Sequence, residues 1–190
     1  MRIGIDIDDT ITDSWECLIP YYSRLFNIPE DKLHKSFPYY RSIKDKVGSV
    51  EDYYRILKPT YDEVTPNVNL LPHVKETIDK LYELGHKVIF ITSRGIDHTN
   101  PYLDTKNFLD KYHVKYDKII VNSKNKAEIC QKENVNLFID DSYKHCKAVS
   151  ELGIPVLMPS RYYNKDDTEF THFSDWNYVY EYIKKRWNNE

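Results

Sequence analysis

The chain opens with an apolar run that ends in a dense group of carboxylates. Three isoleucines in residues 3–7 are β-branched and typical of a strand buried on both faces of a sheet. Asp6, Asp8 and Asp9 lie within four residues at the end of this run, where carboxylates repel one another and lose solvation. A bound Mg²⁺ relieves both costs, because carboxylate oxygens are the ligands that it prefers. For a single segment of this kind, a solvated acidic turn is the alternative.

A second acidic pair follows another apolar segment. Residues 136–139 are typical of a buried strand, and Asp140 and Asp141 come directly after it. Two strand ends of the same character in one chain favour a shared metal site over two separate solvated turns.

The composition is that of an ordinary globular chain. A length of 190 residues suits one domain, or one core domain with an insertion. Hydrophobic residues make up 41% and charged residues 30%, and a net charge of −3 gives no reason to expect a nucleic-acid polymer as partner. No segment reaches the roughly 18 apolar residues of a membrane span, and the chain starts in a strand rather than a signal peptide. We therefore expect no membrane partner.

The cysteines are few and scattered. Cys17, Cys130 and Cys146 match neither a disulfide framework nor a zinc pattern. This usage predicts a reducing, cytoplasmic setting.

From residue 72 onward, helical and strand patterns alternate. Strands are predicted at residues 87–91, 118–121, 137–139 and 154–158, and helices at 72–84, 102–112, 124–133, 143–152 and 176–187. Together with the first strand this gives five buried strands. Strands separated by helices of about ten residues predict an α/β fold with a parallel sheet and right-handed crossovers.

The connection between the first two strands is much longer than one crossover helix. It spans about eighty residues and contains a predicted helix at 14–26 and helix-like patches at 30–34 and 50–57, among several prolines. We predict a core formed by residues 1–13 and 70–190, with residues 14–69 as a small inserted helical domain.

Polar residues that follow successive strands are expected to converge. In open α/β sheets, ligands bind outside the carboxyl ends of the strands. The residues at or near those ends are Asp6, Asp8, Thr92, Ser93, Lys126, Asp140 and Asp141. Carboxylates, a lysine, a hydroxyl and backbone amides are the groups needed for phosphoryl transfer through an aspartyl-phosphate.

The order of these motifs resembles the haloacid dehalogenase (HAD) superfamily of phosphatases. Asp6 and Asp8, then Thr92, Lys126 and the Asp140–Asp141 pair match its four motifs in order. The insertion lies where that superfamily places its C1 cap. The resemblance implies a Rossmann-like core with a helical cap, and a Mg²⁺-dependent phosphoric monoester hydrolase.

The resemblance also implies a role for each matched residue. Asp6 would be the nucleophile and a metal ligand. Asp8 would be the general acid and base, with its backbone carbonyl on the metal. Thr92 and the amide of Ser93 would hold the phosphate, and Lys126 would bridge the phosphate and Asp6.

Three assignments keep an alternative. Asp141 would bind the metal directly with Asp140 beside it, or the two roles are reversed. Lys124 is the alternative to Lys126, which is favoured because an apolar helix face starts just after it. Arg94 would either orient the substrate or pair with an acid.

The substrate prediction rests on a closer resemblance to the 5'-nucleotidases, particularly the deoxyribonucleotidase-like branch. The resemblance lies in residues 5–11, 138–142, 160–164 and the segment at Trp176, although Asp9 and Thr10 depart from the pattern of the better-known deoxyribonucleotidases. Aromatic rings can stack on a nucleobase. The candidate segment contains Phe37, Tyr39, Tyr40 and Arg41, and its alternative role is the insertion's own core. We expect a small phosphomonoester, a nucleotide, as substrate, and leave a homodimer open.

Other functions use a similar set of residues, and a binding module that keeps the fold without catalysis is not favoured because Asp6, Asp8, Lys126 and Asp141 are all present. A phosphatase for sugar phosphates or another small phosphorylated metabolite is the alternative within the same chemistry. A phospho-accepting receiver domain uses similar residues, but there the acidic pair comes first and the phosphorylated Asp ends a middle strand. Here the middle strand ends in Thr92.

Overall fold

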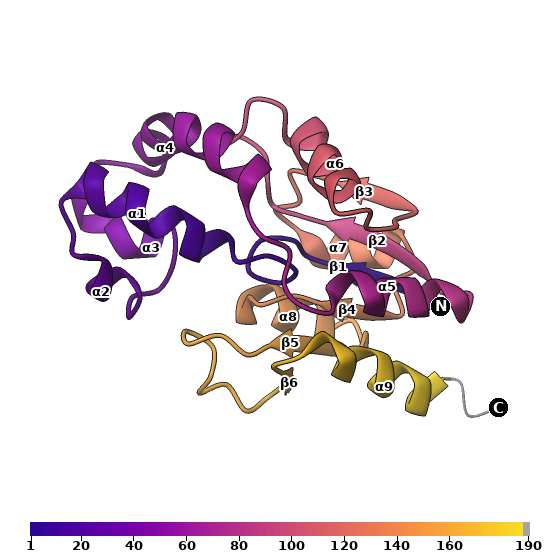
Figure 1. Cartoon of the computed structure of the whole chain (residues 1–190). Helices are drawn as coiled ribbons and strands as arrows, with labels where there is room; N and C mark the ends of the chain where they lie inside the picture. Colours follow the sequence, from indigo (N-terminus) through magenta and orange to yellow (C-terminus); the bar gives the residue numbers. More distant parts are fainter. Residues whose placement is uncertain (188–190) are drawn as a thin grey trace.

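The computed structural model describes residues 1–187, and the last three residues of the predicted core lie outside this range. The chain forms a six-stranded parallel sheet in the order β3-β2-β1-β4-β5-β6 (Figure 1). Its strands are β1 (Arg2–Ile5), β2 (Lys87–Ile91), β3 (Lys118–Ile120), β4 (Leu137–Ile139), β5 (Val156–Pro159) and β6 (Thr171–Phe173). The predicted α/β, Rossmann-like fold is confirmed.

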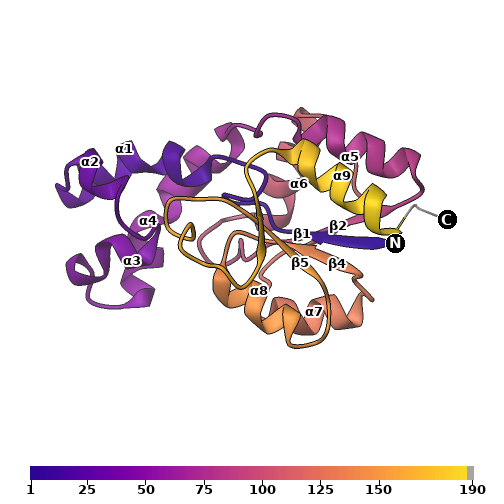
Figure 2. The same cartoon turned by 90° about the horizontal axis from the view of Figure 1, so that it is seen from below.

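Helices cover both faces of the sheet. Figure 2 shows α5 and α9 side by side on one face and α7 and α8 on the other. The helices of the core are α5 (Val74–Glu83), α6 (Pro101–Lys111), α7 (Lys126–Lys132), α8 (Tyr143–Ser150) and α9 (Trp176–Trp187). Within residues 1–187, none of the helices combines the length and the apolar character needed to cross a membrane.

The central strand β1 is fully buried at Ile3 and Ile5, as its β-branched pattern predicts. Gly4 lies between them at a point of close packing. A Cβ atom added at Gly4 would lie 3.1 Å from the Phe138 side chain and 3.2 Å from Ile91 and Val135. The absence of a side chain there lets the neighbouring side chains pack against the backbone of β1.

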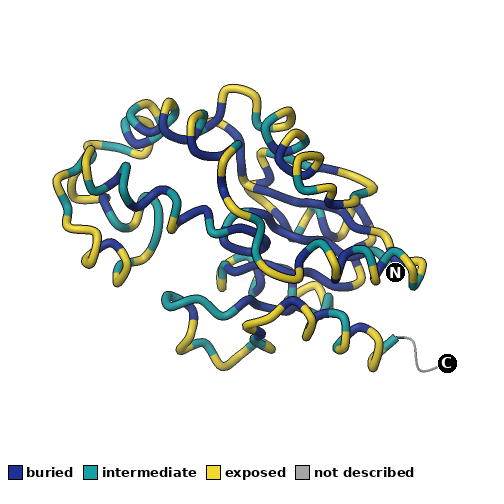
Figure 3. Tube along the Cα trace, in the orientation of Figure 1, coloured by how far each residue is buried: buried dark blue, intermediate teal, exposed yellow. Residues whose placement is uncertain are grey.

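Residues 14–67 form helices that lie to one side of the sheet edge (Figure 1). They are α1 (Ser14–Phe26), α2 (Glu30–Leu33), α3 (Tyr40–Ile43), the 3₁₀ helix η1 (Lys44–Lys46), α4 (Val50–Val64) and the 3₁₀ helix η2 (Thr65–Asn67). The segment leaves and rejoins the core at adjacent points, because Thr12 and Leu70 form an antiparallel bridge. Its buried residues belong to the same apolar core as residues of the sheet, and Figure 3 marks buried residues along both parts.

The structure differs from the prediction at one helix and one strand. The predicted patch at 50–57 continues as α4 to Val64, past Pro59, because Leu57, Tyr61 and Val64 keep one helix face buried. The strand β6 was not predicted. It has only three residues, with Thr171 exposed, so its pattern is too short to stand out from the polar loop before it.

Candidate active site

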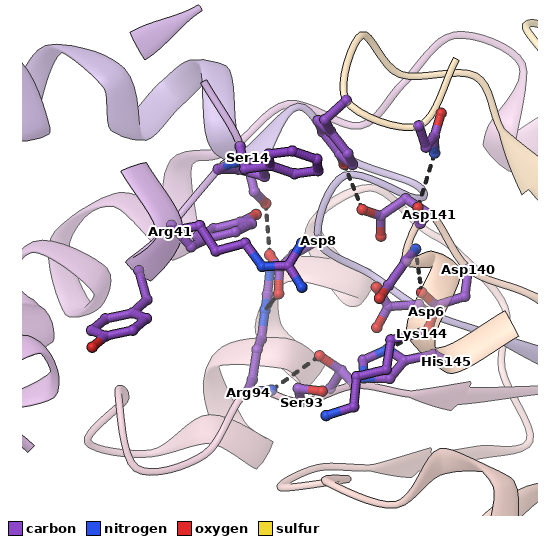
Figure 4. A pocket seen from close by; sticks show the side chains of 18 of the residues that line it. Asp6, Asp8, Ser14, Arg41, Ser93, Arg94, Asp140, Asp141, Lys144 and His145 are labelled. Carbon is purple, nitrogen blue, oxygen red and sulfur yellow. Dashed lines mark hydrogen bonds and ion pairs between the residues drawn. The ribbon is translucent and has the colours of Figure 1, made fainter. Parts of the chain in front are cut away.

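The sheet edge at the carboxyl ends of the strands contains most of the predicted site residues. Asp6 directly follows β1, Thr92 follows β2 and Asp140 follows β4, while Lys126 begins the helix after β3. They line a cavity of about 930 Å³ whose opposite wall comes from α1, α3 and α4 (Figure 4). The strand order reverses between β1 and β4, which is where ligands bind in sheets of this type.

Lys126 lies between two carboxylates. Its ammonium group is 2.5 Å from Asp6 Oδ1 and 2.7 Å from Asp140 Oδ2, and the residue is 2% exposed. Burial opposes its charge, but Asp140 and Asp6 outweigh this effect and raise the pKa of Lys126. Lys124 is exposed, so the buried lysine of the site is Lys126.

Three buried carboxylates form a potential metal site. Asp6, Asp140 and Asp141 each offer an oxygen, and these oxygens lie within 4.8 Å of one another. Burial raises the pKa of Asp6 well above its usual value, against the effect of Lys126. Burial and the charge of Asp140 raise the pKa of Asp141 to about 6. A dense, buried set of carboxylate oxygens with excess negative charge fits a hard divalent cation such as Mg²⁺.

The two members of the acidic pair have different partners. Asp140 accepts hydrogen bonds from Lys126 and from the Ser142 amide at 2.8 Å, and lies 3.3 Å from His145 Nδ1. Although burial alone would raise it, the pKa of Asp140 falls to about 2, chiefly through Lys126. The surroundings of Asp141 contain no comparable cation contact within hydrogen-bond distance among residues 1–187.

Hydroxyl groups hold Asp141 instead. Thr10 Oγ1 donates to Asp141 Oδ1 at 3.2 Å, and the Tyr163 hydroxyl donates to Asp141 Oδ2 at 2.5 Å. Asn164 donates to the backbone carbonyl of Asp141 at 2.9 Å. Sequence reasoning did not assign Tyr163 or Asn164 to the site. Their position just after β5, at the same sheet edge, is the signal that could have identified them.

Asp8 is held by an arginine from the next strand end. Arg94 Nε lies 2.8 Å from Asp8 Oδ2, and Arg94 Nη2 lies 2.7 Å from Asp8 Oδ1. Ser14 Oγ donates to Asp8 Oδ1 at 2.6 Å. Burial alone would raise the pKa of Asp8, but Arg94 and Ser14 lower it to about 2. The structure thus places Arg94 on an acid, one of its two predicted positions.

Thr92 and Ser93 are both at the cavity wall. Thr92 is fully buried, and its hydroxyl accepts a hydrogen bond from the Arg94 amide at 3.2 Å. Ser93 is exposed, and its hydroxyl donates to the Ser123 carbonyl at 3.3 Å. These two hydrogen bonds hold the turn that contains Thr92 and Ser93 in place.

The aromatic segment 37–41 also lines the cavity, but its members differ in their contacts. Phe37 is 51% exposed, with the Arg41 guanidinium 5.2 Å from its ring centroid. Arg41 extends from α3 into the cavity toward Asp8 (Figure 4). Tyr40 packs against the Tyr53 ring at 5.4 Å. Phe37 and Arg41 are therefore the members most open to a ligand.

Tyr39 contacts the turn after β1. Its hydroxyl donates to Asp9 Oδ2 at 2.5 Å, while Asp9 Oδ1 accepts from the Trp15 amide at 2.9 Å. Tyr39 has φ 58° and ψ −137°, a backbone conformation that is strained for a residue with a side chain. The hydrogen bond joins the helical segment to the turn that contains Asp6 and Asp8.

The fold formed by this sheet and its inserted helices is similar to that of solved haloacid dehalogenase-like hydrolases. A haloacid dehalogenase-like hydrolase from Streptococcus pneumoniae matches with a TM-score of 0.69 at 16% identity, over 96% of this chain and 97% of that one. The predicted resemblance is therefore confirmed at the level of the fold. Protein Tyrosine Kinase A from Mycobacterium tuberculosis matches with a TM-score of 0.74 at 15% identity, over 96% of this chain and 97% of that one. Since one fold accommodates different activities, function has to be argued from the site.

Sequence comparison gives a more specific relative. A protein named as a nucleotidase, from Clostridium acetobutylicum, is 28% identical over 185 residues, which cover 95% of this chain and 92% of that protein. No family model matches the chain.

Proposed function

We propose that this protein is a Mg²⁺-dependent phosphatase that hydrolyses nucleoside monophosphates through an aspartyl-phosphate on Asp6. The observation that carries the proposal is the buried group of Asp6, Lys126, Asp140 and Asp141 beside Asp8 at one sheet edge. A nucleophile, a cation and a second carboxylate within one cavity are the groups that this chemistry needs.

In the first step, an Asp6 carboxylate oxygen attacks phosphorus and the bond from phosphorus to the leaving oxygen breaks. The pKa of about 2 keeps Asp8 ionised in the free site. We therefore infer that the proton arrives with the substrate monoanion, and that Asp8 passes it to the leaving oxygen. The products of this step are the free alcohol and the aspartyl-phosphate.

In the second step, water attacks the phosphorus of the aspartyl-phosphate. Asp8 takes a proton from this water, the bond between phosphorus and the Asp6 oxygen breaks, and the proton passes to the departing phosphate. Lys126 offsets negative charge on Asp6 and on the phosphoryl oxygens in both steps. Thr92 and the Ser93 amide hold the phosphoryl group.

A divalent cation would be held by Asp6, Asp141 and the Asp8 carbonyl. Bound Mg²⁺ would offset charge on the phosphoryl oxygens. The partners of Asp140, which include Lys126, support a position for Asp140 beside the metal ligands rather than among them.

The nucleotide assignment is supported by the aromatic wall and by the named relative. Phe37 offers a half-exposed ring at the cavity, and aromatic–base stacking is worth roughly 1–3 kcal/mol. Arg41 would contact the substrate from the same segment.

We propose residues 14–69 as a C1-type cap over a core of residues 1–13 and 70–190. The three cysteines form no disulfide, which supports a cytoplasmic setting. A homodimer stays an open prediction.

A substrate panel tests this function. Purified protein with Mg²⁺ is given nucleoside monophosphates and sugar phosphates, beside Asp6→Asn, and release of phosphate is measured. We expect nucleoside monophosphates to turn over fastest and Asp6→Asn to be inactive. Faster turnover of sugar phosphates would contradict the nucleotide assignment. Equal, negligible turnover in both proteins would contradict the enzyme.

A further inference from the structure

We propose that Arg94 is a positioning residue that aims the Asp8 carboxylate at the leaving oxygen, and that it does not bind the substrate. The proposal rests on the proposed phosphatase function and assigns the part that Arg94 plays in it.

Arg94 lines the cavity, but its guanidinium lies behind the Asp8 carboxylate and is almost fully buried. Its side chain is 1% exposed, whereas the Asp8 side chain is 28% exposed and faces the open space (Figure 4). Two of its nitrogens are used by Asp8, and Nη1 lies 3.5 Å from Thr105 Oγ1. The guanidinium carbon lies 5.8 Å from the Phe108 ring centroid. A substrate phosphate could reach this group only by displacing Asp8.

The contacts leave Asp8 one direction in which to act. A carboxylate has about four lone-pair positions. Arg94 occupies one on each oxygen, and Ser14 occupies a second on Oδ1. The remaining position is on Oδ2. A planar, bidentate arginine fixes the rotation of a carboxylate, which a single ammonium group cannot do.

Arg94 is itself rigidly placed. Its amide donates to Thr92 Oγ1, and its carbonyl accepts from the Asn122 amide at 2.7 Å. The residue after it, Gly95, is equally confined, because an added Cβ would lie 2.6 Å from Asn122 Oδ1. The backbone after β2 thus fixes the position of Arg94, and the buried Arg94 side chain in turn fixes the position of the Asp8 carboxylate.

The experiment compares two leaving groups of similar shape. Phenyl phosphate and p-nitrophenyl phosphate place the same ring in the site, but p-nitrophenolate leaves without needing a proton. Single-turnover release of each phenol isolates the first step from hydrolysis of the aspartyl-phosphate. The variants are Arg94→Met, Arg94→Lys and Asp8→Asn, with Arg55→Met as the matched control, because the Arg55 side chain is 73% exposed.

We expect Arg94→Met to slow phenol release on the order of 10²-fold, as misplacement of a catalytic group does. Release of p-nitrophenol should slow by less than about tenfold, because that leaving group does not depend on the acid. Inhibition by inorganic phosphate should be unchanged. The double variant Arg94→Met with Asp8→Asn should match Asp8→Asn alone, since both changes remove the same function.

Equal losses for the two substrates, weaker inhibition by phosphate, or multiplied losses in the double variant would overturn the proposal. If melting curves show that Arg94→Met does not fold, Arg94→Lys carries the same comparison, because it keeps the buried charge but loses the fork. Wild-type protein that hydrolyses neither the aryl phosphates nor the nucleoside and sugar phosphates would overturn the phosphatase function as well. Activity on them without activity on nucleotides would overturn the nucleotide assignment alone.

Discussion

Lys126 balances two buried carboxylates with one ammonium group. Lys126→Met leaves Asp6 and Asp140 together without that cation. Removing one partner of a buried ion pair costs roughly 3–5 kcal/mol, so we expect the free energy of unfolding in urea to fall by about that amount. Phosphatase activity should be lost with it. Lys124→Met is the matched control, because Lys124 is exposed two residues away. Equal effects of the two substitutions would contradict the role of Lys126.

The contacts around Asp8 and Asp141 show which site residues can be predicted from the sequence and which cannot. Asp6, Asp8, Asp140 and Asp141 are recognisable because each follows an apolar strand within three residues. Pairings between distant residues are harder to predict, because nothing local in the sequence fixes them. Arg94 reaches Asp8 across 86 positions, and Tyr163 contacts Asp141 from a loop whose path depends on the folded sheet.

At the scale of secondary structure, local sequence patterns were sufficient to predict the bounds of an element where its hydrophobic periodicity and its stop signals agree. Helix α1, strand β2 and helix α9 have the predicted bounds. Prediction of helix bounds was poorer where tertiary packing determines the end of the helix. Pro59 predicts a helix end, but α4 continues to Val64 because one of its faces is buried. The same holds for β6, which exists because β5 offers it a partner.

Tyr39 joins the helical segment to the turn after β1 and gives a prediction at this scale. Tyr39→Phe removes a hydrogen bond to the buried Asp9 carboxyl group, whose pKa burial raises to about 7. Hydrogen bonds to neutral and to charged groups are together worth roughly 0.5–3 kcal/mol. We expect a comparable loss of stability in urea, with faster amide hydrogen exchange in α3. Tyr40→Phe is the control, since the structure of residues 1–187 gives the Tyr40 hydroxyl no hydrogen bond. Matching behaviour of the two variants would show that the Tyr39 contact does not hold the segment.

For the whole molecule, the buried acidic group predicts that metal binding and folding are linked. Asp6, Asp140 and Asp141 bring three carboxylates together around the charge of Lys126, so a divalent cation should bind the folded chain far better than the unfolded one. A ligand at a hundred times its dissociation constant stabilises a fold by about 2.7 kcal/mol. For a chain of this size, that corresponds to a rise in Tm of roughly 5–10 °C.

We therefore expect EDTA to lower the Tm by that amount and added Mg²⁺ to restore it, as measured by scanning calorimetry. Asp141→Asn should weaken the response to Mg²⁺ and raise the Tm of the metal-free protein, because it removes one of the repelling charges. Asp45→Asn, at an exposed position outside the site, should respond like the wild type. A Tm that is independent of Mg²⁺ in the wild type would mean that Lys126 and the hydroxyls of Thr10 and Tyr163 satisfy these carboxylates without an ion.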